Sequence, residues 1–325
     1  MKSKILLLLA MILVMGCNEH IFQRVIPITT RTVVNPKKID IDRAADILFV
    51  IDNSGSMAEE QENLARNASS SSSSAPSNAC DGSGFNALRG HIDSHPEQAQ
   101  EDWPQNIQAI FAECGFIERL QLFKNHFRIG IITTDMHDCD APYGGAHRSS
   151  VPQRGCLQTS VQDPTIKVLD WETPDLANKF SNIVRNIGIW GSAWEQGLKS
   201  TQHFLTPAGI VDPRSPSAGT CAQSRDCSGD LPAFLREKEL NASGDEVETK
   251  LVVIFLTDEE DCSNDGTIDE QQPGSTDLCY SQPNLLKDTQ AYVSFFRGLK
   301  TRPELVSMAL IAGLFDTGSG FTPSG

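Results

Sequence analysis

Three side chains with oxygen donors follow one apolar segment of the chain. Asp52, Ser54 and Ser56 come directly after the apolar residues 47–51, in the pattern D-x-S-x-S. A carboxylate and two hydroxyls in one tight turn, with Gly55 permitting the bend, present hard oxygen donors on one side. Such donors suit Mg²⁺, Mn²⁺ or Ca²⁺. The spacing therefore indicates a site for a divalent cation.

The same residues have a plainer interpretation. Ser56 is followed three positions later by Glu59, which is the capping-box pattern of a helix N-terminus. The pattern D-x-S-x-S is also a weak signal by itself, because serine is a common residue. A cation site requires further donors, and Asp258, which ends another apolar segment, is the first candidate.

Strands and helices are expected to alternate along the chain. The segments with strand character are 47–51, 127–134, 166–171, 251–257 and 305–312. Helical patterns lie at 57–65, 107–124, 174–186, 192–204 and 285–300. This alternation predicts an α/β fold with a doubly wound, mostly parallel sheet. Ligands bind beyond the carboxyl ends of the strands in such sheets, and that is where Asp52 and Asp258 are expected.

With these elements in place, the chain resembles the von Willebrand factor type A (vWA) domain. The metal ion-dependent adhesion site (MIDAS) of that family combines D-x-S-x-S after the first strand, a threonine opening a later helix, and an aspartate after the fourth strand. Asp52, Ser54 and Ser56 match the first part and Asp258 matches the last, while Ser192 stands where the family has threonine. Ser192 has an alternative role, because it also begins a capping box three positions before a glutamate.

The resemblance covers residues 44–313 and implies the strand order 3-2-1-4-5-6, with 166–171 as an antiparallel edge strand. Two insertions are expected, at 66–104 without regular structure and at 206–249 with a short helix near 231–239. The Gly- and Ser-rich tail 314–325 follows the fifth strand. We therefore expect either a fragment or a sheet that lacks its last helix and strand.

The function implied by the resemblance is binding, not catalysis. Hydroxyl ligands would leave Mg²⁺ (or Mn²⁺ or Ca²⁺) electrophilic, with one position open to an aspartate or glutamate of a protein partner. One alternative is a structural envelope protein whose metal site only stabilises the fold. Another is a phosphohydrolase with Asp52 as nucleophile, although such enzymes have a second aspartate where this chain has Ser54.

The N-terminus predicts export and lipidation. Residues 1–16 read as a signal peptide, with Lys2 and Lys4 before an apolar run that is too short for a permanent membrane helix. The sequence Val-Met-Gly-Cys resembles a bacterial lipobox, which implies a lipid-modified Cys17 followed by a tether at 17–43. The alternative is a plain signal peptide. Asn18 favours the outer membrane of the bacterial cell envelope by resemblance to lipoprotein sorting.

Composition and net charge limit the possible binding partners. The chain of 325 residues is 39% hydrophobic, which is enough for a sizeable core, and its net charge is −15. A surface this acidic repels nucleic acid and suits cations.

Eight cysteines remain besides Cys17. An even number of cysteines in an exported chain predicts disulfides. Connectivity is not fixed by sequence, and our guess pairs neighbours: Cys80 with Cys114, Cys139 with Cys156, Cys221 with Cys227, and Cys262 with Cys279. A zinc site is the rival interpretation, but the chain has no CxxC motif.

A second acidic loop, at 261–269, resembles the start of an EF-hand. Gln272 stands where that motif has a bidentate glutamate, so we expect an ordinary acidic loop.

Overall fold

The structure is a computed structural model of the whole chain. It describes residues 44–69, 82–95, 98, 100–122, 126–136, 155–160, 162–189, 191, 194–206, 230–240, 244–265, 268, 278–279 and 281–312. The predicted signal peptide, Cys17, the tether and the tail all lie outside these residues.

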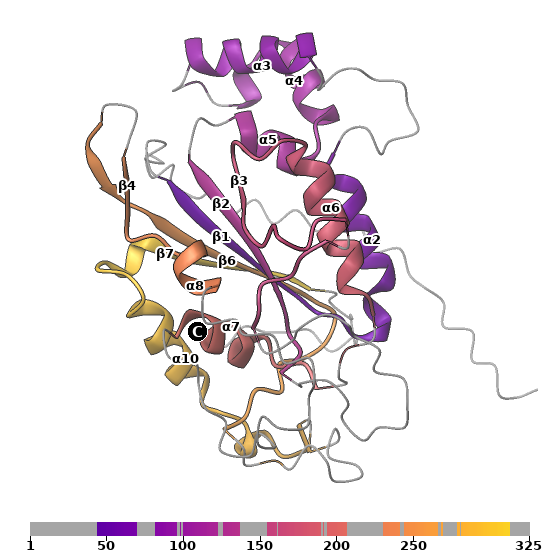
Figure 1. Cartoon of the computed structure of the whole chain (residues 1–325), viewed down its shortest axis with the longest axis vertical. Coiled ribbons are helices and arrows are strands. Elements are labelled where there is room, and N and C mark those ends of the chain that lie inside the picture. The colour runs from indigo at the N-terminus through magenta and orange to yellow at the C-terminus, as the bar shows by residue number, and fades with distance from the viewer. Residues whose placement is uncertain are drawn as a thin grey trace, which may run out of the picture. The chain divides into compact units, whose positions relative to one another are not determined.

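A five-stranded sheet forms the centre of the fold (Figure 1). Its strands are β1 (Ala45–Ile51), β2 (Phe127–Thr133), β3 (Leu169–Asp170), β6 (Lys250–Thr257) and β7 (Val306–Ala312), in the order β3-β2-β1-β6-β7. Only the short edge strand β3 is antiparallel to its neighbour. The predicted α/β class is confirmed, and the order agrees with the first five positions expected. No sixth strand of this sheet occurs among the described residues.

Both faces of the sheet are covered because its central strand is apolar on both sides. Alternate residues of a strand point to opposite faces. In β1, Phe49 belongs to one core cluster, whereas Leu48 and Val50 belong to the other. A strand buried on both faces reads as the continuous apolar run seen in the sequence.

Different helices cover the two faces, as Figure 1 shows for α2 and α6 on one side and α7 and α10 on the other. The first side carries α2 (Ala58–Asn67), α5 (Phe116–Leu122) and α6 (Leu176–Ile187). The second side carries α7 (Gly197–Leu205), α8 (Asp230–Phe234) and α10 (Thr289–Arg297). The predicted helices are present with shifted bounds; the largest shift is the start of α7, five residues later than expected.

The insertion at 66–104 contains structure that we did not expect. Helix α3 (Gly82–Ser94) and the short η4 (Gln100–Asp102) lie within it, and the predicted helix 107–124 is divided into α4 (Gln105–Glu113) and α5. Together they bury a small separate core: Leu88, Trp103, Ile107, Cys114 and Leu122. The sequence 85-88-92 has helical spacing of apolar residues, but the surrounding glycines and serines obscured it.

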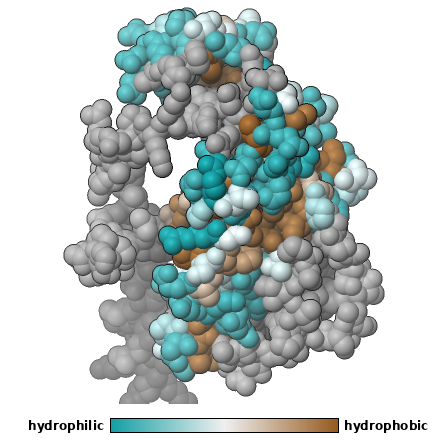
Figure 2. All heavy atoms as spheres, turned by 90° about the vertical axis from the view of Figure 1, so that its left-hand side faces the viewer, coloured by the Kyte–Doolittle hydropathy of each residue, from teal (hydrophilic) through white to brown (hydrophobic). Residues whose placement is uncertain are grey.

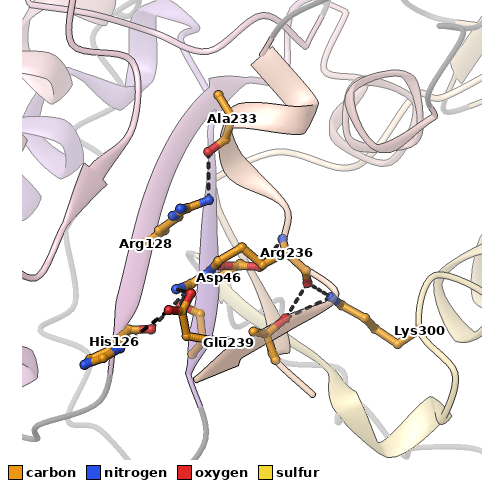
Figure 3. A network of polar contacts seen from close by, with 9 residues as sticks. Asp46, His126, Arg128, Ala233, Arg236, Glu239 and Lys300 are labelled. Atoms are coloured by element: carbon orange, nitrogen blue, oxygen red, sulfur yellow. Dashed lines mark hydrogen bonds and ion pairs between the residues drawn. The ribbon is translucent and has the colours of Figure 1, made fainter. Parts of the chain in front are cut away.

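The insertion at 206–249 differs from the expected helix near 231–239. Helix α8 ends at Phe234, and a hairpin of β4 (Lys238–Leu240) and β5 (Glu246–Glu248) follows. Arg236 lies between α8 and β4. It is held by Asp46, which is fully buried at the start of β1. The Arg236 backbone N–H and Nε donate to the two Asp46 carboxylate oxygens at 2.8 and 2.7 Å (Figure 3). This pairing turns the chain away from a helix.

Strand β7 is the exposed edge of the sheet. Met308, Leu310 and Ile311 are 46%, 66% and 52% exposed. Figure 2, which looks at the side of the molecule on the left of Figure 1, shows hydrophobic residues at the surface between hydrophilic ones. The remaining short elements are η1 (Gly55–Met57), η5 (Pro283–Leu285) and η6 (Pro303–Leu305). None of the described helices has the length and apolar character needed to cross a membrane.

Candidate cation site at the strand ends

Asp52 is fixed at the end of β1 by hydrogen bonds to both carboxylate oxygens. The Ser54 backbone N–H donates to Oδ1 at 2.8 Å, and the Thr257 hydroxyl donates to Oδ2 at 2.8 Å. Asp52 is fully buried. Its carboxylate therefore has one defined orientation, set from its own turn and from the neighbouring strand β6.

Hydroxyl groups continue from Asp52 toward the second strand end. Ser54 Oγ and Ser56 Oγ lie 3.0 Å apart, and Ser56 donates to Asp258 Oδ1 at 3.2 Å. The structure thus brings together Asp52, Ser54, Ser56 and Asp258, which are up to 206 positions apart in the sequence.

Strand pairing explains why these residues meet. In the parallel ladder Ile51 lies beside Leu256, and the Asp52 N–H donates to the Leu256 carbonyl at 2.9 Å. The ladder continues to the last residue before the turn, so the ends of β1 and β6 are level. Side chains that follow these strands must emerge at the same edge of the sheet.

The capping interpretation of Ser56 is wrong in this structure. Ser56 lies inside η1, and α2 begins after Met57 with no side-chain cap. The Ser56 hydroxyl is used by Asp258 instead.

Ser192 lies outside the described residues, but the segment before it is held against the same turn. The Gly191 N–H donates to the Asn53 carbonyl at 2.8 Å. A Cβ at Gly191 would lie 2.5 Å from Asn53 Cγ, which is closer than side chains tolerate. Gln61 of α2 adds a bridge, because its Nε2 donates to the carbonyls of Asp52 and Gly188 at 2.9 and 3.0 Å.

Glu195 is a site residue that sequence reasoning did not identify. The sequence pattern predicts a capping box of Ser192 with Glu195, but α7 begins at Gly197 and has no side-chain cap. The Glu195 side chain is 2% exposed and accepts a hydrogen bond from the Thr134 hydroxyl instead. Burial, with the nearby charges of Asp52 and Asp135, raises the pKa of Glu195 to about 10.

A second acidic residue is affected by the same charges. Burial, together with the charges of Asp52 and Asp258, raises the pKa of Glu259. The raised pKa values of Glu195 and Glu259 show that carboxyl groups are crowded in a region that favours positive charge. The carboxyl ends of β1 and β6 are therefore electrostatically suited to a cation.

The donor set fits a small divalent ion in type and spacing. Neighbouring oxygens in an octahedral Mg²⁺ shell lie about 3.0 Å apart, given metal–oxygen distances of about 2.1 Å. The spacings along Ser54, Ser56 and Asp258 are 3.0 and 3.2 Å. Within the described part of the chain, no group of three or more His, Cys, Asp or Glu side chains is arranged to hold a metal. The candidate site therefore depends on the serine hydroxyls.

A disulfide closes the loop that follows Asp258. Cys262 and Cys279 are bonded, with Cα atoms 5.5 Å apart, which confirms that predicted pair. Cys114 and Cys156 are also disulfide-bonded. The pairings proposed for them stay predictions, because the other cysteines lie outside the described residues: Cys80, Cys139, Cys221 and Cys227.

The acidic loop at 261–269 uses its first aspartate locally. Asp261 accepts hydrogen bonds from the backbone N–H groups of Leu198 and Ser263, both at 2.9 Å. Its carboxylate thereby joins the start of α7 to the β6 loop.

Comparisons with protein-family models and with curated proteins find no match to this chain.

Proposed function

We propose that this chain is a lipid-anchored protein of the bacterial cell envelope whose vWA domain binds a divalent cation at a MIDAS. The cation, Mg²⁺ in the first instance, then binds an aspartate or glutamate of a protein partner. The observation that carries the proposal is the convergence of Asp52, Ser54, Ser56 and Asp258 at the carboxyl ends of two adjacent parallel strands.

The strand order supports the assignment to the vWA family. The family's order begins 3-2-1-4-5 with an antiparallel edge strand, and the sheet here runs β3-β2-β1-β6-β7 with β3 antiparallel. Ser192 would add a fifth donor from the segment that Gly191 holds against Asn53.

The residues around the ion would bind and orient it. Ser54 and Ser56 are neutral donors, so they compensate little of the charge of a divalent ion. Asp52 is anchored by the Ser54 N–H and the Thr257 hydroxyl, which fixes its orientation toward the ion's shell. When bound, the ion supplies Lewis acidity toward a carboxylate of the partner.

Binding is favoured over catalysis by the state of Asp52. A carboxylate that attacks phosphorus must reach its substrate, whereas Asp52 is fully buried and both of its oxygens accept hydrogen bonds. Its geometry suits a residue that orients other ligands.

A paired experiment separates recruitment of a partner from stabilisation alone. Thermal melting in Mg²⁺ and in chelator is measured beside a pull-down from envelope extract under the same two conditions. A site saturated at 100 times its Kd stabilises the fold by about 2.7 kcal/mol. We expect that stabilisation together with Mg²⁺-dependent capture of a partner.

Two variants give the controls. Ser54→Ala should lose both effects, whereas Ser94→Ala, at an exposed position of α3 where the hydroxyl donates to the Gly90 carbonyl, should keep both. Stabilisation by Mg²⁺ without capture would favour the structural envelope protein, and capture that persists in chelator would contradict the proposal.

A further inference from the structure

The amide side chain of Gln61 joins two segments that are distant in the sequence. Only 4% of Gln61 is exposed. Its Nε2 donates to the Asp52 carbonyl at 2.9 Å and to the Gly188 carbonyl at 3.0 Å. The first carbonyl belongs to the turn after β1, and the second follows α6, 127 positions from Gln61. An amide nitrogen carries two protons, so both are used in these contacts.

The place of Gln61 in α2 explains how it reaches the turn. Gln61 lies in the first turn of α2, which begins at Ala58. Side chains of a helix lean toward its N-terminus, so a residue of the first turn covers the segment before the helix. Here that segment carries Ser54 and Ser56. A buried amide needs partners for its protons, and the two carbonyls supply them.

The chain that leaves α6 is shaped to meet the same turn. Gly188, directly after α6, has φ 71° and ψ −171°, a conformation that is open essentially only to glycine. The Gly191 N–H then donates to the Asn53 carbonyl at 2.8 Å. A Cβ at Gly191 would lie 2.5 to 2.7 Å from the amide atoms of Asn53. The two glycines therefore let this backbone lie directly against the turn.

The Asp52 backbone is fixed on both sides of the residue. Its N–H donates to the Leu256 carbonyl of β6, whereas its carbonyl accepts from Gln61 of α2. The peptide group that begins with this carbonyl leads into Ser54 and Ser56, so its orientation decides where the chain goes after β1. Gln61 thus controls the direction in which the two serine hydroxyls leave the strand.

We propose that Gln61 is a positioning residue of the candidate cation site. Its amide holds the Asp52 and Gly188 carbonyls together, and it keeps the D-x-S-x-S turn in its cation-binding arrangement before an ion binds, without contacting the ion. The inference rests on the proposed function and deepens it, because a turn that is already ordered loses less conformational entropy on binding. The same contact ties the turn to the segment that leads to the proposed donor Ser192.

The test is a calorimetric titration of the whole chain with Mn²⁺, beside hydrogen exchange of backbone amides in chelator, which needs no metal. Gln61→Met keeps a long side chain that favours helix and removes both donors. Residues that orient metal ligands typically change affinity by 10- to 100-fold when removed, so we expect the Kd for Mn²⁺ to rise by at least about tenfold. In chelator the Ser54 amide, which donates to Asp52 within the turn, should exchange faster than in the wild type.

Ser181→Ala is the matched control. Ser181 is 4% exposed, and its hydroxyl lies 2.7 Å from the Ala65 carbonyl of α2 and 2.8 Å from the Ala177 carbonyl of α6. It joins α6 to α2 at a later point of α2 than Gln61 does. Its loss should lower the melting temperature but leave Mn²⁺ affinity and exchange of the Ser54 amide unchanged.

Gly191→Ala tests the other end of the contact, and it replaces Gln61→Met if that variant does not fold. Gly191 is only partly buried, and the new Cβ would press against the Asn53 amide. This should move the backbone away from the turn. We expect a higher Kd for Mn²⁺ and faster exchange of the Ser54 amide, as in Gln61→Met.

Weaker Mn²⁺ binding and faster Ser54 exchange in Gln61→Met, with neither change in Ser181→Ala, support the inference. Wild-type Mn²⁺ affinity in Gln61→Met would overturn it and leave the proposed function intact, because Gln61 would then only stabilise the packing of α2. An equal loss of affinity in Ser181→Ala would also overturn it, since a general loss of stability would explain the change. A wild-type chain that binds no Mn²⁺ would overturn both.

Discussion

The Thr257 hydroxyl donates a 2.8 Å hydrogen bond to Asp52 Oδ2, across 205 positions of sequence. This contact joins the last residue of β6 to the first residue after β1. It fixes the Asp52 carboxylate without the help of an ion. It also links the stability of the strand ends of β1 and β6 to the geometry of the site.

Thr257→Val should therefore weaken both the fold and cation binding. The isosteric change leaves Asp52 Oδ2 without its hydroxyl donor, and loss of such a bond costs about 1–2 kcal/mol. We expect a lower melting temperature in chelator and a weaker response to Mg²⁺. Thr257→Ser, which keeps the hydroxyl, should restore the Mg²⁺ response; if Thr257→Val behaves like the wild type in both conditions, the contact is unimportant.

Asp46→Asn tests whether the start of β1, opposite to the end that carries Asp52, affects the cation site. Asp46, which is fully buried, forms an ion pair with Arg236, which is mostly buried; Arg236 Nε lies 2.7 Å from Asp46 Oδ1. Removing one partner of a buried pair typically costs about 3–5 kcal/mol. Denaturant unfolding should show a loss of this size, while the stabilisation produced by Mg²⁺ stays the same. A changed Mg²⁺ response would show that the two ends of β1 are coupled.

The ion pair between α2 and α6 predicts a dependence on pH. Hydrogen bonds from Arg185 and Arg66 lower the pKa of Glu62 from 4.5 to about 2. A carboxyl group whose pKa is lowered by folding stabilises the fold above its unfolded pKa, and this contribution is lost as the pH falls from about 4.5 through about 2.

The corresponding variant is Glu62→Gln. Glu62 and Arg185 are both partly exposed, so solvent screening limits the expected loss at pH 7 to about 1 kcal/mol or less. Unfolding measured from pH 7 to pH 2 should show the wild type and the variant converging at the acid end. A constant difference over that range would mean that the charge of Glu62 is irrelevant.

Reduction of the Cys262–Cys279 disulfide should loosen the loop that follows Asp258. The bond closes a loop across 17 positions, and removal of a disulfide of this kind costs about 2–4 kcal/mol. The double variant Cys262→Ser/Cys279→Ser should therefore lose stability and bind Mn²⁺ more weakly, whereas stability loss with unchanged Mn²⁺ affinity would confine the bond to a structural role.

The sheet and the strand-end donors could be predicted because their signals are local or topological. The apolar runs that became β1, β2 and β6 are unbroken, and parallel pairing places Asp52 and Asp258 at one edge. Glu195 could not be found in this way. Its sequence context matches a capping box, and only the tertiary contacts with Thr134 and Asp52 show that its carboxyl group is buried beside the end of β1.

The predictions for the two insertions were wrong for a similar reason. Helix α3 packs in a small core with Trp103, which comes later in the same insertion, and its apolar residues at 85, 88 and 92 stand among glycines and serines, so the segment 82–94 gives only a weak helical signal by itself. At 206–249 the contact between Arg236 and Asp46 decides the local structure, and no local pattern reveals a partner 190 positions away.

The most direct measurement is the number of Mn²⁺ ions bound per chain, determined by electron paramagnetic resonance for the wild type, Asp52→Ala and Asp258→Ala. Both carboxylates lie at the strand ends where the donors converge, so we expect one tightly bound ion in the wild type and none at the same concentration in either variant. An ion bound equally well by all three chains would contradict the site.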